Sequence, residues 1–327
     1  MRIAVIGGGA VGCLIAARLA AATSAEIALV VRRAAAAADI RRHGIRMTTP
    51  SGRVARAPVT VTDDPLSLGV QDLVIICVKA YAVKGVLHGL SAITGPETVV
   101  MPVINGIPWW YPAFQPAPLD GVRLTSVDPD GVLSAAIDPA RLIGAVTYVA
   151  VETHGDGVIR HVNDQRFVFG DPAGRDTPML AAVTELFRQA GFDALATPDI
   201  RGHIWTKLWG NLAFNPLSVL TGAPLTTICT NPGTREVSVR MMAEAQAVAE
   251  RLGVRFGMSI DARIETSAAI GDFKTSMLQD YEAGRRLEIE AIVGAAIELA
   301  GIVGVAVPTL ATIRALTDLR AKSRDAA

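Results

Sequence analysis

The chain opens with MRIAVIGGGAVGCLIAARLAAA (Met1–Ala22), the stretch that decides the fold of its first half. A short continuous apolar run, typical of a strand buried on both faces, leads through a glycine cluster into an Ala/Leu-rich helical pattern. The glycines fill the three places of GxGxxG, which permit a tight turn, let the backbone approach a pyrophosphate and allow close packing of helix on strand. Although such turns also arise for packing alone, the position between strand and helix favours a dinucleotide site, formed by Gly7, Gly9, Ala10, Val11 and Gly12.

The second predicted strand, near Glu26 to Val31, ends in two arginines, about 20 residues after the last of these glycines. A protein that prefers NAD usually has an acidic residue there, and this sequence has none. An arginine can pair with the 2′-phosphate of NADP in forked geometry, so we predict NADPH as the cofactor, with Arg32 binding it. For Arg33 the better interpretation is a solvated side chain.

Two further buried-strand runs continue the βαβ alternation: DLVIICVK (Asp72–Lys79) and TVVMPV (Thr98–Val103), separated by a helical stretch from Tyr81 to about Ile93. In doubly wound sheets, ligands bind beyond the carboxyl ends of the strands. Lys79 follows one run and Asn105-Gly106 the other, so both are predicted to line the cofactor cleft. The alternatives are a solvated loop charge for Lys79 and a plain turn for Asn105-Gly106.

From Leu142 to Gly170 the pattern changes to alternating β-branched segments, which predict antiparallel strands that extend the sheet. His154 and His161 lie here without metal-ligand spacing, so we interpret both as structural or surface residues and predict no metal. Pro178 to Ala190 is predicted to be a helix, followed by a short edge element and a helix start at Thr197-Pro198-Asp199.

Beyond residue 199 strand patterns almost vanish, and helices are predicted at 200–220, 235–252, 261–271 and 280–301, with a disordered tail at 322–327. The predicted organisation is α/β plus all-α. A Rossmann-type, NADP-binding, doubly wound domain spans residues 1–198, and a helical substrate and catalytic domain spans 199–327.

Composition favours a small-molecule ligand. The chain has 327 residues, with 31 Lys plus Arg against 31 Asp plus Glu, so nothing in the net charge indicates nucleic acid or an anionic membrane. Three widely spaced cysteines indicate neither a disulfide framework nor zinc, and favour a reducing, cytoplasmic location. The most apolar region, Ile289 to Val307, contains Glu290, Glu298 and recurring glycines, so it predicts a buried helix followed by a turn rather than a membrane span. No signal peptide is visible.

A polar seam runs through IWTKLWGNLAFNPLSVLTG (204–222), where Lys207, Asn211 and Asn215 recur every four residues among apolar ones. At about 100° of rotation per residue, the three share one helical face. The segment KTSMLQDYEAGRRLEIEAIVG (274–294) adds Ser276 and Glu288. A buried lysine or glutamate is costly unless paired, so the spacing fits equally a substrate site or a Lys–Glu salt bridge between helices.

Taken together, GGGAVG, CVKAY with Lys79, NG at Asn105, the K-x3-N-x3-N-P run, and SMLQD with Glu288 resemble the ketopantoate reductase (2-dehydropantoate 2-reductase) family over nearly the whole chain. The resemblance implies that Lys207 is the general acid and that Glu288 holds substrate. It also implies that Asn105, Asn211, Asn215 and Ser276 contact substrate, and that Lys79 and Asn105 lie near the nicotinamide end of the cofactor. The implied activity is NADPH-dependent reduction of ketopantoate, a step of pantothenate biosynthesis, in a cleft between the two domains.

The chemistry agrees with these roles. Reduction of a 2-oxo carbon creates an alkoxide, which a positioned ammonium stabilises and protonates. Desolvation would lower the pKa of Lys207 from about 10.4 toward the working pH, whereas a nearby Glu288 would oppose that shift. Asparagines donate and accept hydrogen bonds, which suits a substrate with carboxylate, keto and hydroxyl oxygens.

Three alternatives stay open. Trp109 and Trp110, in GIPWWYPAF, are expected near the nicotinamide end and could adapt the site to a different 2-oxo acid or ketone, or could simply pack in the interior. The protein could also be a non-catalytic NADPH-binding regulator, or an NAD-dependent dehydrogenase that acts oxidatively. The helical domain could bury a homodimer face or complete a monomer core.

Overall fold

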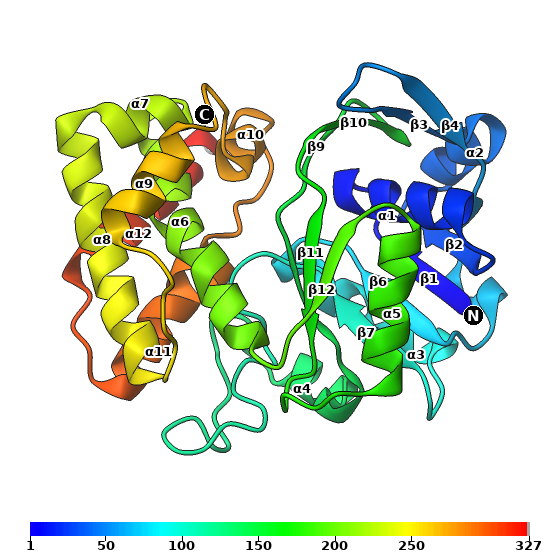
Figure 1. Ribbon diagram of the computed structural model, residues 1–327, viewed down its shortest axis with the longest axis horizontal. Helices are drawn as coiled ribbons and strands as arrows, with labels where there is room; N and C mark the ends of the chain where they lie inside the picture. Colours follow the sequence, from blue (N-terminus) through cyan, green and yellow to red (C-terminus); the bar gives the residue numbers. More distant parts are fainter. Residues whose placement is uncertain (326–327) are drawn as a thin grey trace. The chain divides into compact units, whose positions relative to one another are not determined.

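The computed structural model describes residues 1–325, which form two compact units (Figure 1). Unit 1 comprises Met1–Ile104 and Val132–Ile200, and unit 2 comprises Asn105–Gly131 and the chain from Arg201 onward. The predicted combination of an α/β half and an all-helical half is therefore confirmed. The segment Asn105–Gly131 lies in the sequence between parts of unit 1 but packs with the helices of unit 2.

Unit 1 is built on a five-stranded parallel sheet of the Rossmann type, in the order β5-β2-β1-β6-β7. All four residues of β6 are buried, because both faces of the sheet are covered. The order reverses at β1, which places the ends of β1 and β6 side by side at the switch point. The strands are β1 (Arg2–Ile6), β2 (Glu26–Val30), β5 (Thr60–Thr62), β6 (Leu73–Ile76) and β7 (Val99–Pro102).

The predicted strands between Leu142 and Gly170 exist, but the prediction that they extend this sheet is wrong. They pair in a four-stranded sheet, β4-β3-β10-β9, and a three-stranded sheet, β12-β11-β8, and only an isolated bridge joins Leu142 to Val100. Two of their pairings, β10 with β3 and β11 with β12, are parallel. The strands are β3 (Ile45–Thr48), β4 (Val54–Ala57), β8 (Gly144–Thr147), β9 (Ala150–Thr153), β10 (Val158–Asn163), β11 (Arg166–Gly170) and β12 (Asp193–Ala196).

Burial explains this arrangement. Helix α1 (Ala10–Ala22) packs on β1 and β2 and also contacts β3, β4, β9 and β10, so the four-stranded sheet covers a helix that would otherwise be exposed. The three-stranded sheet is fixed by an aromatic cluster, in which Phe167 and Phe169 of β11 lie 5.1 and 4.8 Å from Phe187, centroid to centroid. Alternation predicts a strand but not its partner, which burial of this kind selects.

The remaining helices of unit 1 are short. The expected helix from Tyr81 to Ile93 is split into a 3-10 helix, η2, and a seven-residue α-helix, α3. Helix α5 matches the prediction from Pro178 and begins with a Thr177 cap. These elements are α2 (Ala34–His43), η1 (Pro65–Leu68), η2 (Ala80–Val86), α3 (Leu87–Ile93), α4 (Val132–Ala136), η3 (Pro139–Arg141) and α5 (Pro178–Gln189).

Unit 2 is helical within residues 1–325, with one break that the sequence pattern did not predict. The expected helix at 280–301 is interrupted, because α10 ends at Glu282 and Gly284, at φ +67°, turns the chain back so that the Arg285 amide bonds to Asp280 O at 2.8 Å. The elements are α6 (Ile200–Thr221), α7 (Leu225–Thr230), α8 (Pro232–Arg251), α9 (Ile260–Ala268), α10 (Ser276–Glu282), the π-helix η4 (Glu290–Gly294), α11 (Ala295–Val303) and α12 (Pro308–Asp325).

The prediction of a disordered tail from residue 322 is wrong up to Asp325. Helix α12 includes these residues, and Arg324 donates to Tyr281 O at 2.7 Å while its guanidinium lies 5.0 Å from the Tyr281 ring centroid. This docking supplies the interactions that a free terminus lacks. Residues 326 and 327 lie outside the described part of the chain.

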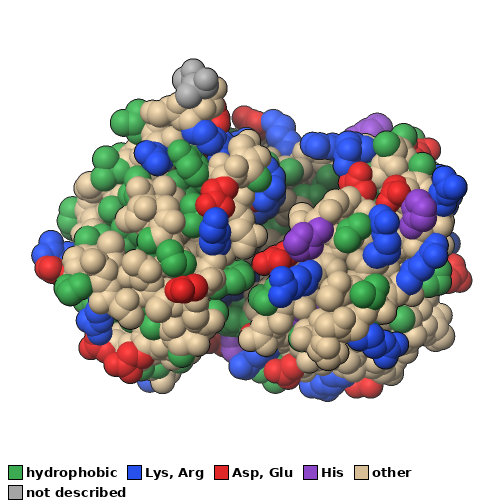
Figure 2. Space-filling view, turned by 90° about the horizontal axis from the view of Figure 1, so that it is seen from above, with side chains coloured by type: hydrophobic (Ala, Val, Ile, Leu, Met, Phe, Trp, Pro, Cys, Tyr) green, Lys and Arg blue, Asp and Glu red, His purple; other side chains and the backbone are tan. Residues whose placement is uncertain are grey.

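Charges of both signs mix on the surface. The face drawn in Figure 2 carries Lys and Arg side chains interspersed with Asp and Glu, as the equal numbers of the two classes lead one to expect. In the part of the chain that the structure describes, no helix combines the length and the apolarity that crossing a bilayer requires.

Candidate active site

The glycine turn has the geometry of a phosphate-binding loop. Gly7 has φ +122°, and a Cβ there would lie 2.4 Å from Cys77 O, at the end of the neighbouring strand β6. A Cβ at Gly12 would lie 2.0 Å from Gly7 O. By contrast, a Cβ at Gly9 would meet no atom within 4 Å, so the space beside it is open.

Helix α1 presents its first amides without a protein cap. Gly9 is its N-cap residue and offers no side chain, so the amides of Ala10, Val11 and Gly12 are left for a ligand. An open approach at Gly9 together with uncapped amides fits the pyrophosphate of a dinucleotide, so these residues would hold it.

The other predicted cofactor residues of unit 1 occupy the strand ends that the sequence indicated. Val31, which follows β2, lies beside the turn, since a Cβ at Gly8 would be 2.7 Å from Val31 Cγ1. Arg32 comes next and is exposed. Lys79 follows β6 and is the N-cap residue of η2, with Ala82 N donating to its carbonyl at 2.7 Å.

In unit 2, helix α6 carries the polar seam as expected. Lys207 and Asn211 are half-buried and Asn215 is buried, whereas the neighbouring Trp205 and Trp209 are fully buried. Within residues 1–325, the side-chain amides of Asn211 and Asn215 form no hydrogen bond to another residue. An amide can both donate and accept hydrogen bonds, so two amides without a protein partner in that part of the chain are suited to a polar ligand.

Lys207 Nζ donates to Asn105 Oδ1 at 2.7 Å. The two residues stand 102 positions apart in the sequence, and both belong to unit 2. Asn105 was expected at the end of a strand of the first domain, beside the cofactor, and was not paired with the lysine by any sequence pattern. The contact makes Asn105 the residue that fixes the Lys207 ammonium.

A π-helical turn holds Asn105 in place. In η4 the Ala295 amide bonds to Glu290 O, five residues back, which frees Ala291 O to accept from Ile107 N at 2.8 Å. Gly106, at φ +85°, passes so close that a Cβ would lie 2.2 Å from Ala291 O. Asn105-Gly106 is thus more than a plain turn, since the glycine lets the loop pack against Ala291, three residues after Glu288.

Glu288 and Ser276 also lie in unit 2. Glu288 is buried, at 6% exposure, and its carbonyl accepts from Ile292 N at the start of the helix that contains η4. Ser276 is the first residue of α10, capped by Thr275. Thr275 Oγ1 lies 2.6 Å from Ser218 Oγ, which also donates to Asn215 O, so the start of α10 is tied to the Asn215 end of the seam.

Burial lowers the pKa of Lys207 to about 8, and the negative charge of Glu288 acts in the opposite direction. The ammonium is therefore mostly protonated at neutral pH yet gives up its proton more readily than a solvated lysine. A strongly shifted group with defined partners is a mark of a functional site.

The segment that carries Asn105 is anchored by residues that the sequence reasoning missed. Glu298 accepts from Thr125 N at 2.7 Å and from Ser126 N at 2.9 Å, and also from both hydroxyls. Partial burial opposes ionisation of this carboxyl, but the hydrogen bonds from Ser126 and Thr125 together lower its pKa below the usual value. No local pattern links residues about 170 positions apart, so only the fold reveals this anchor.

Trp109 and Trp110 belong to the same segment and are 3% and 4% exposed. Next to them, Trp205 Nε1 donates to Tyr111 Oη at 2.7 Å, and Arg201 lies 5.8 Å from the Trp110 ring centroid. The indole N–H groups of both tryptophans have no acceptor within residues 1–325. Burial supports a packing role for these rings, and their position relative to a cofactor stays a prediction.

His161 and His154 take a structural and a surface position, respectively. His161 is buried with Nε2 2.6 Å from Asp164 O, and exposed His154 lies 3.4 Å from Glu152. Among residues 1–325, no group of three or more His, Cys, Asp and Glu side chains could hold a metal ion.

The structure thus brings the predicted residues into two groups. Lys207, Asn105, Asn211, Asn215, Ser276 and Glu288 are all in unit 2, whereas the glycine turn, Arg32 and Lys79 are in unit 1. The first group contains an ammonium with a lowered pKa, which an amide holds and a carboxylate influences, and the same unit adds further amide and hydroxyl groups. Such a set can bind and protonate an oxygen-rich small molecule.

Comparisons with known proteins agree with this set of candidate site residues. Residues 3–174 match the family described as ketopantoate reductase PanE/ApbA, and residues 199–321 match its C-terminal domain family. A 2-dehydropantoate 2-reductase from Mesorhizobium japonicum is 42% identical over 97% of this chain and 96% of its own length. The crystal structure of a candidate ketopantoate reductase from Ralstonia solanacearum MolK2 is 40% identical, with a TM-score of 0.93 and coverage of 99% of this chain and 98% of that one.

A more distant structure shares the fold alone. A D-mandelate dehydrogenase in complex with NADH and anilino(oxo)acetate is 19% identical, with a TM-score of 0.84 over 99% of this chain and all of that chain (100%).

Proposed function

The chain belongs to the ketopantoate reductase PanE/ApbA family of oxidoreductases, and we propose that it reduces a 2-oxo acid with NADPH, ketopantoate being the substrate. The observation that carries the proposal is the Lys207–Asn105 pair, in which a lysine with a pKa lowered to about 8 is fixed at 2.7 Å from its partner. A cofactor-binding regulator would gain nothing from such a group.

Each residue of the site has a part in this reaction. Bound NADPH would supply the hydride. Lys207 would stabilise the negative charge that develops on the keto oxygen and donate the proton, and such general acids typically contribute 10²- to 10⁴-fold. The unpaired amides of Asn211 and Asn215 and the Ser276 hydroxyl would bind the carboxylate and hydroxyl oxygens of the substrate.

Glu288 would have a double role. Its negative charge raises the pKa of Lys207 against the effect of burial, which keeps the acid protonated at neutral pH. As a buried acceptor it can also hold a substrate hydroxyl. Arg32, beside the glycine turn, would bind the 2′-phosphate that distinguishes NADPH from NADH.

The test is turnover of ketopantoate, followed by the loss of NADPH absorbance, in the wild type and in Lys207→Ala. We expect the variant to lose about 10²- to 10⁴-fold in kcat while it binds NADPH as tightly as the wild type. Lys322→Ala, an exposed lysine paired with Asp318 in α12, is the matched control and should retain full activity.

The other outcomes separate the alternatives. Binding of NADPH by both proteins without turnover of any 2-oxo acid would indicate a regulator. Turnover of a different member of a 2-oxo acid panel would leave the acid role of Lys207 in place and change the substrate. Faster reaction with NADH, unaffected by Arg32→Ala, would overturn the cofactor assignment.

A further inference from the structure

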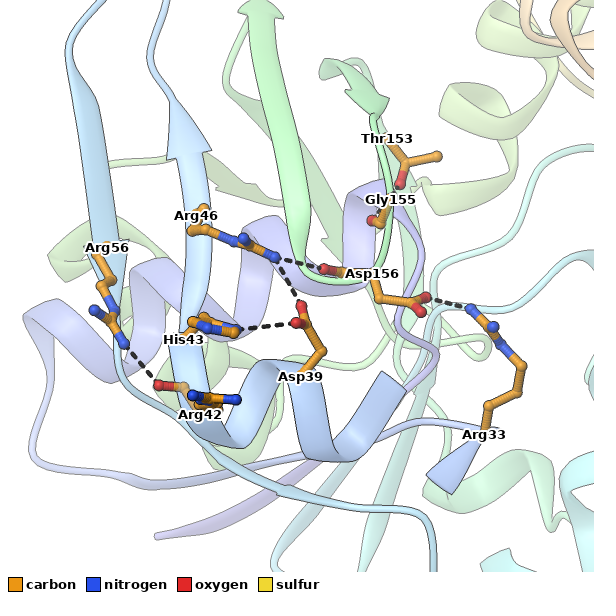
Figure 3. A network of polar contacts seen from close by, with 9 residues as sticks. All are labelled: Arg33, Asp39, Arg42, His43, Arg46, Arg56, Thr153, Gly155 and Asp156. Atoms are coloured by element: carbon orange, nitrogen blue, oxygen red, sulfur yellow. Dashed lines mark hydrogen bonds and ion pairs between the residues drawn. The ribbon is translucent and has the colours of Figure 1, made fainter. Parts of the chain in front are cut away.

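The hairpin between β9 and β10 reaches over the start of α2, where Asp156 forms an ion pair with Arg33 (Figure 3). Both side chains keep contact with solvent, at 60% exposure for Arg33 and 34% for Asp156. Arg33 was expected to be simply solvated, and Asp156 was not singled out in the sequence. The pair is 123 positions apart, so only the fold creates it.

The backbone of this hairpin is held firmly. Arg46 N donates to Gly157 O at 2.8 Å, and the Arg46 side chain donates to Asp156 O at 3.4 Å and to Asp39 at 2.7 Å. A Cβ at Gly157 would lie 2.6 Å from Ile40 Cγ1 of α2. These contacts fix the main chain at Asp156 independently of its carboxylate, and Figure 3 shows those of the Arg46 side chain with Asp156 and Asp39.

The location makes the pair relevant to a dinucleotide. Arg33 is the N-cap residue of α2 and follows Arg32, two positions after Val31, which lies beside Gly8 of the glycine turn. In this fold the adenosine ribose binds at the end of the second strand of the sheet, next to that turn. Asp156 also raises the pKa of Cys13 in the first turn of α1, second to burial, so its charge is felt at the phosphate-binding helix.

A carboxylate at this place should treat the two nicotinamide cofactors differently. NADH has a ribose 2′-hydroxyl, which a carboxylate tolerates or accepts a hydrogen bond from, whereas NADPH has a 2′-phosphate, which a carboxylate repels. Arg33 can neutralise one anion fully but not two. An ion pair this exposed contributes little to stability, so the guanidinium can leave Asp156 at little cost.

We propose that Asp156 and the 2′-phosphate of the cofactor compete for Arg33, so that Asp156 is a specificity-determining residue that reduces the preference for NADPH over NADH. The inference rests on the proposed function and refines its cofactor. Arg32 remains the principal phosphate ligand, and Arg33 contributes to the extent that Asp156 releases it.

The experiment measures binding rather than turnover. Dissociation constants for NADPH, NADH, 2′,5′-ADP and 5′-AMP are compared in the wild type and in Asp156→Asn, which keeps the shape and removes the charge. We expect Asp156→Asn to bind NADPH and 2′,5′-ADP about three- to tenfold more tightly, and NADH and 5′-AMP within about twofold of the wild type. Glu152→Gln removes a charge from the same hairpin, where Glu152 faces His154. This control should change none of the four dissociation constants.

Arg33→Gln provides an independent arm. This variant should bind NADPH and 2′,5′-ADP about threefold or more weakly than the wild type, and its affinity for NADH should not change. The proposal is overturned if Asp156→Asn leaves the NADPH/NADH ratio unchanged or lowers it, or if Arg33→Gln does not weaken NADPH. Melting temperatures of all variants verify folding.

Failure of this inference is distinguishable from failure of the proposed function. Wild-type protein that binds neither NADPH nor NADH would contradict the proposed function. Wild-type protein that binds NADPH and reduces ketopantoate, with a cofactor ratio that does not respond to Asp156→Asn, would contradict only the role of Asp156.

Discussion

The glycine turn and the Lys207 site are built from different parts of the chain. Gly7 to Gly12 form a site of contiguous residues that offers backbone amides. This site requires glycine, without a side chain, at Gly7, Gly9 and Gly12. The Lys207 site offers side chains from α6, from the loop at Asn105 and from the segment around Glu288. The first therefore depends on local shape, and the second on how distant segments are held together.

A methyl group in the turn should have the largest effect, because this site depends on local shape. In Gly12→Ala the new Cβ would meet Gly7 O at 2.0 Å, a backbone atom that cannot move without moving β1. We expect a loss of at least about 3 kcal/mol in the free energy of unfolding and loss of NADPH binding. Chemical denaturation and NADPH fluorescence measure the two effects.

Gly9→Ala is the matched partner of that variant. Its Cβ meets no atom within 4 Å, so stability should stay within about 0.5 kcal/mol of the wild type while NADPH binding weakens, because the methyl group fills the ligand's space. If Gly9→Ala bound NADPH normally, the turn would not be the pyrophosphate site.

At the other site the corresponding change removes the partner of the lysine. Asn105→Ala deletes the acceptor 2.7 Å from Lys207 Nζ, and a hydrogen bond to a charged group is worth about 1.5–3 kcal/mol. We expect kcat/KM for the 2-oxo acid to fall about 10- to 100-fold with NADPH binding retained. Equal loss in Asn105→Asp, which keeps an acceptor, would show that the hydrogen bond is not what matters.

The charge of Glu288 should appear in the pH dependence. In the proposed reaction Lys207 must be protonated, so the rate should be level at neutral pH and fall as pH rises through about 8. Because Glu288 raises the pKa of Lys207, the falling limb in Glu288→Gln should move to lower pH, apart from any loss in absolute rate. A limb that stays in place would mean that Lys207 is not the titrating acid.

The smallest expected effect concerns the docking of the C-terminal helix. Arg324→Ala loses the bond to Tyr281 O at 2.7 Å and the contact with the Tyr281 ring. We expect the free energy of unfolding to fall by about 1–2 kcal/mol, since these are one charge-assisted bond and one cation–π contact. Lys322→Ala, which loses only an exposed pair with Asp318, should melt like the wild type.

Much of the fold could be predicted because its patterns are local. The run Leu73–Ile76 and the seam on α6 each lie within a single element, where a continuous apolar run or a period of 3.6 is decisive. The glycine turn is a spacing within a few consecutive residues between β1 and α1. The break after Glu282 escaped prediction because Gly284 ends a helix whose apolar pattern continues beyond it. The sequence also did not predict that β10 pairs with β3 and β11 with β12, because the alternation of apolar residues carries no information about which strands pair.

The sequence by itself determined which residues are chemically equipped: the glycines that leave space, the arginines after β2, and the lysine, asparagines and glutamate of the helical half. Only the tertiary structure decided which of them act together. It paired Lys207 with Asn105, docked Gly106 on Ala291 and set Asp156 against Arg33, across separations of more than 100 residues. The physical reason is that pKa shifts and hydrogen bonds depend on burial and distance in space, which long-range packing sets and local propensity does not.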